Sequence, residues 1–125
     1  MKKLLGYIIA SLLLVTILNA CYYDEVVVFV GLPTNVSLKN DVVPIFNSNC
    51  TSAGCHDAVP AYAPSLVQDK AYNALVNGNF INTNQPDKSL LYTTMLSGGM
   101  PPSGPLGTND LKIILGWITE GAKNN

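Results

Sequence analysis

Two cysteines and a histidine stand close together near the middle of the chain. Cys50 and Cys55 are separated by four residues, and His56, the only histidine in the protein, follows directly. Two thiols placed in this way can add to the two vinyl groups of a porphyrin, and the next side chain is then an imidazole that can bind the iron. The pattern predicts covalent attachment of one haem. The usual attachment pattern has only two residues between the cysteines, so the segment 51–54 must bulge, and Gly54 suits such a turn.

The same three residues also allow a simpler interpretation. In an exported protein, Cys50 and Cys55 can form a small disulfide, because free thiols rarely persist in an oxidising compartment. His56 would then be an ordinary surface or core histidine. Nothing in that interpretation requires a histidine directly after the second cysteine, so haem attachment remains the favoured hypothesis.

The first twenty residues have the pattern of an export signal. Two lysines precede an apolar run from Leu4 to Leu18, and the small residue Ala20 comes directly before Cys21. This arrangement resembles the signal peptide of a bacterial lipoprotein (residues 1–20), in which Cys21 is lipidated and begins the mature protein. An ordinary secretory signal and a transmembrane anchor are the alternatives, although the run is short for a span. We expect a lipid-anchored protein of the bacterial cell envelope, either periplasmic or exposed at the surface.

The chain beyond residue 20 carries little charge. It has five lysines, no arginine and eight acidic residues, which gives a net charge near −3. A mildly acidic chain without arginine is a poor candidate for binding nucleic acid. A lipid on Cys21 and a haem on Cys50 and Cys55 would account for all three cysteines.

Residues 21–35 are expected to link the lipid anchor to the folded domain. Val26 to Val30 is apolar and β-branched, which favours a short strand, but no second strand to pair with it is apparent. The acidic pair Asp24 and Glu25 resembles the surface-export signals of some Gram-negative lipoproteins, but a simply solvated pair is the favoured interpretation. Gly31 to Asn35 has the composition of a linker.

Apolar periodicity predicts four short helices in residues 36–125, which would form one all-α domain. The segments 57–65 and 97–107 are rich in Gly and Pro and should be loops. Pro44 is best tolerated in a first turn, which places the regular part of the first helix from about Asp41. The expected helices run from an N-cap at Ser37 through Phe46, from Gln68 to Val76, from Pro86 to Leu96, and from an N-cap at Thr108 to a stop at Gly121.

From Asp41 onward, the chain resembles a small single-haem c-type cytochrome of the class I type. The matching segments are Pro44-Ile45-Phe46, Cys50…Cys55-His56, Gly99-Met100-Pro101-Pro102, and the closing helix from Leu111 to Gly121 with Trp117. The resemblance implies a small bundle of about four helices around one covalent haem c. It also implies thioethers at Cys50 and Cys55, His56 as the proximal iron ligand, and Met100 as the distal ligand. The four-residue spacing departs from the usual pattern of that family, and wider spacings of this kind occur among c-type cytochromes, mostly in multihaem ones.

The remaining apolar residues fit the same hypothesis. Four short helices bury a marginal apolar area for a domain of this size, and a buried flat cofactor would supply much of the missing core. Met95 lies on an expected helix and is interpreted as packing, whereas Met100 lies in a Gly/Pro loop outside any helical periodicity. Five residues are expected to line the haem: Phe46, Leu66, Tyr72, Leu90 and Trp117.

A haem ligated by His56 and Met100 implies an electron carrier and not an enzyme. A methionine thioether favours ferrous iron and raises the reduction potential, and two filled axial positions leave no site for oxygen or peroxide. We therefore expect electron transfer with redox partner proteins of the cell envelope. The alternatives are a haem enzyme or sensor with an open distal site, and a haem-free envelope binding module with a Cys50–Cys55 disulfide.

Overall fold

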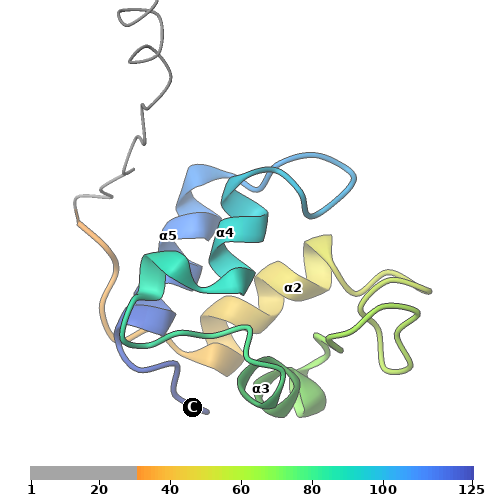
Figure 1. The fold of residues 1–125 in the computed structure, drawn as a ribbon, viewed down its shortest axis with the longest axis horizontal. Coiled ribbons are helices and arrows are strands. Elements are labelled where there is room, and N and C mark those ends of the chain that lie inside the picture. The colour runs from red at the N-terminus through yellow and green to blue at the C-terminus, as the bar shows by residue number, and fades with distance from the viewer. Residues whose placement is uncertain (1–30) are drawn as a thin grey trace, which may run out of the picture.

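The computed structural model describes residues 31–125, so the predictions for the signal peptide (1–20), for lipidation of Cys21 and for a strand over Val26 to Val30 lie outside the described residues. Residues 31–125 form helices joined by loops and contain no strand (Figure 1), which confirms the all-α class. No helix in this range is both long and apolar enough to cross a membrane. The helices are α2 (Val43–Asn49), α3 (Gln68–Asn77), α4 (Leu90–Leu96) and α5 (Thr108–Thr119), with the single turns η1 (Leu38–Val42) and η2 (Pro86–Lys88).

The first helix begins as predicted, with Ser37 as its N-cap. The Oγ of Ser37 accepts a hydrogen bond from the backbone N–H of Asn40 at 3.1 Å. The chain makes one wide turn, η1, and then continues as α2. Pro44 lies in the first turn of α2, where a missing N–H is tolerated.

α5 supplies the centre of the hydrophobic core. Leu111, Ile114, Leu115 and Ile118 are all buried, as their spacing predicts, and α5 packs against α4 and η1. Trp117 is fully buried, and its indole N–H donates to the carbonyl oxygen of Lys123 at 2.8 Å. Burial of each large apolar side chain contributes about 1.5–3 kcal/mol, so α5 makes a large contribution to the stability of the domain.

The N-cap predicted at Thr108 is wrong by one residue. Gly107 has the extended backbone of an N-cap (φ −62°, ψ 150°), and its carbonyl oxygen accepts a hydrogen bond from the N–H of Leu111. Thr108 is the first helical residue and makes no capping hydrogen bond. Glycine is accepted at an N-cap because it adopts this conformation at little cost.

The single helix predicted from Pro86 to Leu96 is also wrong, because Ser89 divides it into η2 and α4. The side chain of Ser89 is buried, and its Oγ accepts a hydrogen bond from the N–H of Asn82 at 2.9 Å. The next turn is held by a long-range bond from the N–H of Leu91 to the carbonyl oxygen of Phe80 at 3.0 Å. These contacts keep Ser89 extended (ψ 131°), and a helix cannot continue through that conformation.

The two ends of the described chain are tied together. The carboxylate of Glu120, at the end of α5, accepts hydrogen bonds from the backbone N–H groups of Asn35 (2.7 Å) and Val36 (2.9 Å). These two bonds hold the pKa of Glu120 below its usual value. Asn125 accepts hydrogen bonds from the N–H groups of Leu38 and Lys39, both at 2.9 Å. The C-terminal end therefore lies against η1 (Figure 1).

Candidate functional site

Cys50 ends α2, and its thiol faces inward. Its backbone N–H donates to the carbonyl oxygen of Phe46 at 2.7 Å, and only 9% of the residue is exposed. Burial, reinforced by the neighbouring Cys55, raises the pKa of the Cys50 thiol from 9.0 to about 11. Cys50 is therefore a protonated thiol at neutral pH. Cys55 is exposed, and both cysteines are free.

The segment between the cysteines forms the bulge that the wide spacing predicts. The N–H of Cys55 donates to the carbonyl oxygen of Ser52 at 2.9 Å, and the N–H of His56 donates to that of Cys50 at 3.1 Å. Gly54 has φ +79°, a left-handed conformation that other residues adopt only with strain. The turn takes up the additional residues and brings His56 back to the end of α2.

His56 is half-buried, and its ring is fixed by one hydrogen bond. Its Nδ1 lies 2.8 Å from the carbonyl oxygen of Pro64. A carbonyl oxygen can only accept, so Nδ1 is the donor, and in the neutral ring Nε2 carries the free lone pair. The backbone also holds this position, because the N–H of Leu66 donates to the carbonyl oxygen of His56 at 2.8 Å. Nε2 is therefore the ring nitrogen through which His56 could bind a metal.

Asp57 is a residue that the sequence analysis did not single out. Its carboxylate accepts hydrogen bonds from the N–H groups of Gly54 (2.9 Å) and Val59 (3.0 Å), one to each oxygen. Its backbone carbonyl accepts a bond from the Oγ of Ser65 at 2.6 Å. An acidic residue directly after His56 was the available signal; its carboxylate partners are local, and only the bond from Ser65 depends on the return of the loop eight residues later.

Met100 lies on a second loop, between α4 and α5. The N–H groups of Gly99 (3.0 Å) and Met100 (3.3 Å) both reach the carbonyl oxygen of Thr94, and the next residue, Pro101, is buried. Met100 itself is 38% exposed, whereas Met95 is 3% exposed in the core, as expected for packing. The hydrogen bonds to Thr94 therefore fix the backbone of the loop, while the thioether of Met100 remains accessible.

The structure brings three of the predicted haem-binding residues into one loop and places the fourth on another. Cys50, Cys55 and His56 are joined by the turn after α2. Within residues 31–125, no hydrogen bond connects Met100 to that turn. In the view of Figure 1, loop 50–66 lies at the right beyond α2, and loop 97–107 lies at the top above α4 and α5.

The five residues expected to line a haem occupy different environments. Phe46, Leu66 and Trp117 are buried in the core. Tyr72 is half-buried and packs against the edge of the core, and Leu90 is 54% exposed on α4. Only the first three are thus part of the continuous apolar interior.

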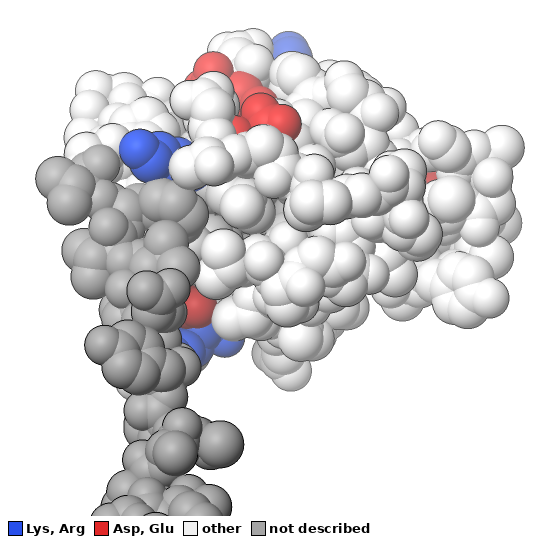
Figure 2. Space-filling view, turned by 90° about the horizontal axis from the view of Figure 1, so that it is seen from above, with Lys and Arg blue, Asp and Glu red and all other residues white. Residues whose placement is uncertain are grey.

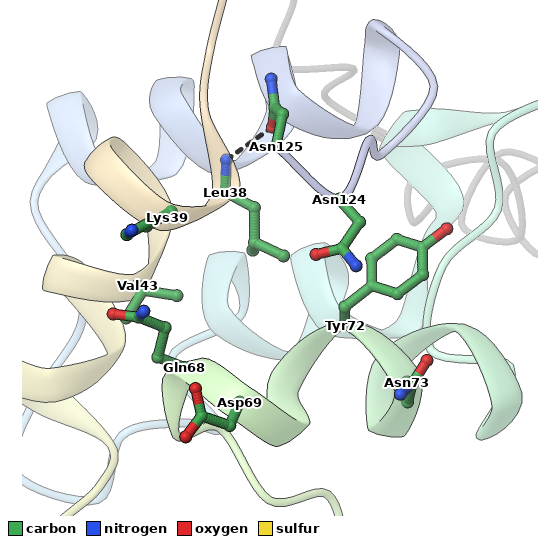
Figure 3. A pocket seen from close by; sticks show the side chains of 9 residues that line it. All are labelled: Leu38, Lys39, Val43, Gln68, Asp69, Tyr72, Asn73, Asn124 and Asn125. Carbon is green, nitrogen blue, oxygen red and sulfur yellow. Dashed lines mark hydrogen bonds between the residues drawn. The ribbon is translucent and has the colours of Figure 1, made fainter.

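Two cavities of the described part lie elsewhere. One, of about 330 Å³, is bounded by η1, α3 and the C-terminal residues, with Tyr72 and Asn124 facing each other across it (Figure 3). The other, of about 520 Å³, lies between residues 31–36 and α5. Cys50, Cys55, His56 and Met100 line neither cavity. Among residues 31–125, no three His, Cys, Asp or Glu side chains gather to hold a bare metal ion.

The two loops that carry the predicted ligands are almost free of charge. Asp57 is the only Asp, Glu, Lys or Arg in residues 42–68, and residues 89–109 contain none. In Figure 2, the side of the surface toward which the 50–66 loop extends is accordingly nearly all white. A partner that meets these loops encounters uncharged side chains, so long-range steering by charge is weak there.

No protein-family model matches this chain, and no curated protein or solved structure does either. The function of this protein must therefore be inferred from the chain's own residues and their geometry.

Proposed function

We propose that this protein is a single-haem c-type cytochrome that carries electrons in the bacterial cell envelope. One haem c would be attached through Cys50 and Cys55, with His56 as the proximal iron ligand and Met100 as the distal ligand. When bound, the haem iron takes up and releases one electron at a time. The protein would be an electron carrier and not an enzyme.

The hydrogen bond from Nδ1 of His56 to Pro64 is the observation that carries this proposal. Histidines that bind metals almost always donate their other ring N–H to a carbonyl or carboxylate, which fixes the tautomer and the ring orientation. His56 has this arrangement, at 2.8 Å, directly after a free and exposed cysteine. A histidine with only a packing role has no need for both features at once.

The state of the two cysteines also supports haem attachment. In haem attachment each thiol would add across a vinyl C=C bond: the sulfur would bond to one carbon, the hydrogen would go to the other, and the vinyl group would become a substituted ethyl group. No oxidant or reductant is consumed. The reaction requires free thiols, and both Cys50 and Cys55 are free. It also requires access, which Cys55 has at the surface, whereas the buried thiol of Cys50 at the end of α2 would have to become exposed before it reacts.

The contrast between the two methionines supports Met100 as the distal ligand. Met95 is enclosed by the core and cannot leave it without opening a cavity. Met100 is partly exposed on a loop whose backbone is held by Thr94. A sixth ligand from Met100 would leave no open position on the iron for oxygen or peroxide, as an electron carrier requires.

The envelope location is proposed from the N-terminal sequence. A lipid on Cys21 would tether the protein to a membrane through residues 21–35, and its partners would be redox proteins of the envelope. Replacing Cys21 with Ser in the full chain should release the protein from the membrane fraction. Continued membrane association of that variant would contradict a lipid tether.

The proposal is tested by producing the full chain in a bacterial envelope compartment together with haem-attachment machinery. We expect a coloured protein whose mass contains one haem and whose pyridine haemochrome spectrum is that of a thioether-bound haem. A variant with Ser at both Cys50 and Cys55 should lack covalent haem. A colourless wild-type protein, with a mass showing a cystine and no added macrocycle, would overturn the proposal and favour a haem-free module.

A further inference from the structure

We infer that Asp57 is a positioning residue that shapes the wide Cys50–Cys55 spacer for attachment at both cysteines. The inference rests on the proposed function, because it concerns how this chain presents its two thiols to one haem. It assigns a role to a side chain that the attachment pattern itself does not contain.

The carboxylate of Asp57 accepts hydrogen bonds both from the spacer that precedes His56 and from the loop that follows it. One oxygen, Oδ2, accepts the N–H of Gly54 at 2.9 Å, and the other, Oδ1, accepts the N–H of Val59 at 3.0 Å. Hydrogen bonds to a charged acceptor are stronger than neutral ones. Gly54 is the residue with φ +79°, so Asp57 holds the point at which the spacer reverses.

The backbone of Asp57 also helps to position the residue that orients His56. Its carbonyl oxygen accepts the hydroxyl of Ser65 at 2.6 Å, and Ser65 directly follows Pro64, the hydrogen-bond partner of His56. The side-chain carboxylate of Asp57 therefore positions the spacer. Its backbone carbonyl positions Pro64 and Ser65, the part of the loop that orients the imidazole of His56. A single residue links the two thiols to the iron ligand.

The wide spacing explains why such a residue is needed. The vinyl groups of a porphyrin lie at fixed positions, so Cys50 and Cys55 must present their sulfurs at a fixed separation. A four-residue spacer has more conformations than a two-residue one, and ordering each additional residue costs conformational entropy. Hydrogen bonds that order Gly54 before the haem arrives remove part of this cost from the attachment step.

The test compares Asp57→Ala and Asp57→Asn with the wild-type chain, all matured with haem-attachment machinery. Peptide mass spectrometry after alkylation of free thiols counts chains with both cysteines joined to haem and chains with only one. We expect Asp57→Ala to lower the doubly attached share by roughly fivefold or more, with Cys50 or Cys55 recovered alkylated. Asp57→Asn keeps one acceptor oxygen and should fall between Asp57→Ala and the wild type.

Two further variants serve as controls. Asp110→Asn removes the same charge from the first turn of α5 and should mature like the wild type. Ser65→Ala removes only the bond to the Asp57 carbonyl, so it should disturb the low-spin spectrum more than the thioether count. Normal double attachment in Asp57→Ala, or an equal loss in Asp110→Asn, would overturn the inference.

Amide hydrogen exchange on the haem-free chain gives a second readout that does not depend on maturation. Removing the carboxylate should speed exchange at Gly54 and Val59 by roughly tenfold, with the α5 amides unchanged. Unchanged exchange at both residues would refute the role of Asp57 in the loop. A wild-type protein that never binds haem would instead refute the proposed function, so the two failures are distinguishable.

Discussion

The Nδ1 of His56 lies 2.8 Å from the carbonyl oxygen of Pro64, eight residues further along the chain. This bond closes a loop that begins at the end of α2 and returns to the core at Leu66, which is buried. It gives the only imidazole of the protein a defined tautomer.

Replacing His56 with Ala should abolish the low-spin haem spectrum, even where thioethers still form, because the protein has no other histidine to replace the ligand. The measurement is the visible spectrum of the purified ferric protein. Added imidazole should restore a low-spin spectrum by entering the vacated position. An unchanged spectrum without imidazole would remove His56 from the ligand set.

The two methionines should respond in opposite ways to substitution by alanine. Met100→Ala should remove the methionine-to-iron charge-transfer band in the red from the haem-loaded protein. In the haem-free chain it should change the free energy of unfolding by less than about 1 kcal/mol, because the side chain is partly exposed. Met95→Ala should keep the band but lower the free energy of unfolding by about 2–5 kcal/mol, because it opens a core cavity. Spectra and denaturant unfolding of both variants decide the matter. Loss of the band only in Met95→Ala would reverse the assignment.

The two loop cysteines of the haem-free chain should differ in reactivity. Cys55 is exposed, whereas Cys50 is buried and its pKa is raised to about 11, so little thiolate forms at Cys50 at neutral pH. In a Cys21→Ser background, iodoacetamide should modify Cys55 at least about tenfold faster than Cys50. Peptide mapping over a time course measures both rates, and the same experiment in urea should bring them together. Equal rates in the folded protein would contradict the inward position of Cys50.

Glu120 should make the stability of the domain depend on pH in the acid range. Hydrogen bonds from the backbone N–H groups of Asn35 and Val36 lower the pKa of Glu120 in the folded state below its ordinary value of 4.5. Its contribution is therefore complete above pH 4.5 and is lost as the pH falls through the folded-state pKa. Glu120→Gln should lower Tm at pH 7, and the difference from the wild type should shrink toward pH 3. A difference in Tm that is the same at both pH values would argue against this tie.

The amino-acid sequence determined the helical class and most of the elements. Repeats of apolar residues at helical spacing located α3 and α5 to within a residue or two, because one face of each helix must be buried. The Ser37 cap was also local, since its hydroxyl reaches an amide three residues away. The motif of Cys50, Cys55 and His56 is likewise a property of the sequence, because their types and order define the chemistry.

Tertiary contacts decided the features whose partners are distant along the chain. The break at Ser89 depends on Asn82 and Phe80, which local periodicity does not register. The orientation of His56 and the hydrogen bond at the backbone carbonyl of Asp57 depend on a loop that must first return at Pro64 and Ser65. Local spacing therefore named the residues that could bind haem, whereas hydrogen bonds across the folded loop set how those residues are presented.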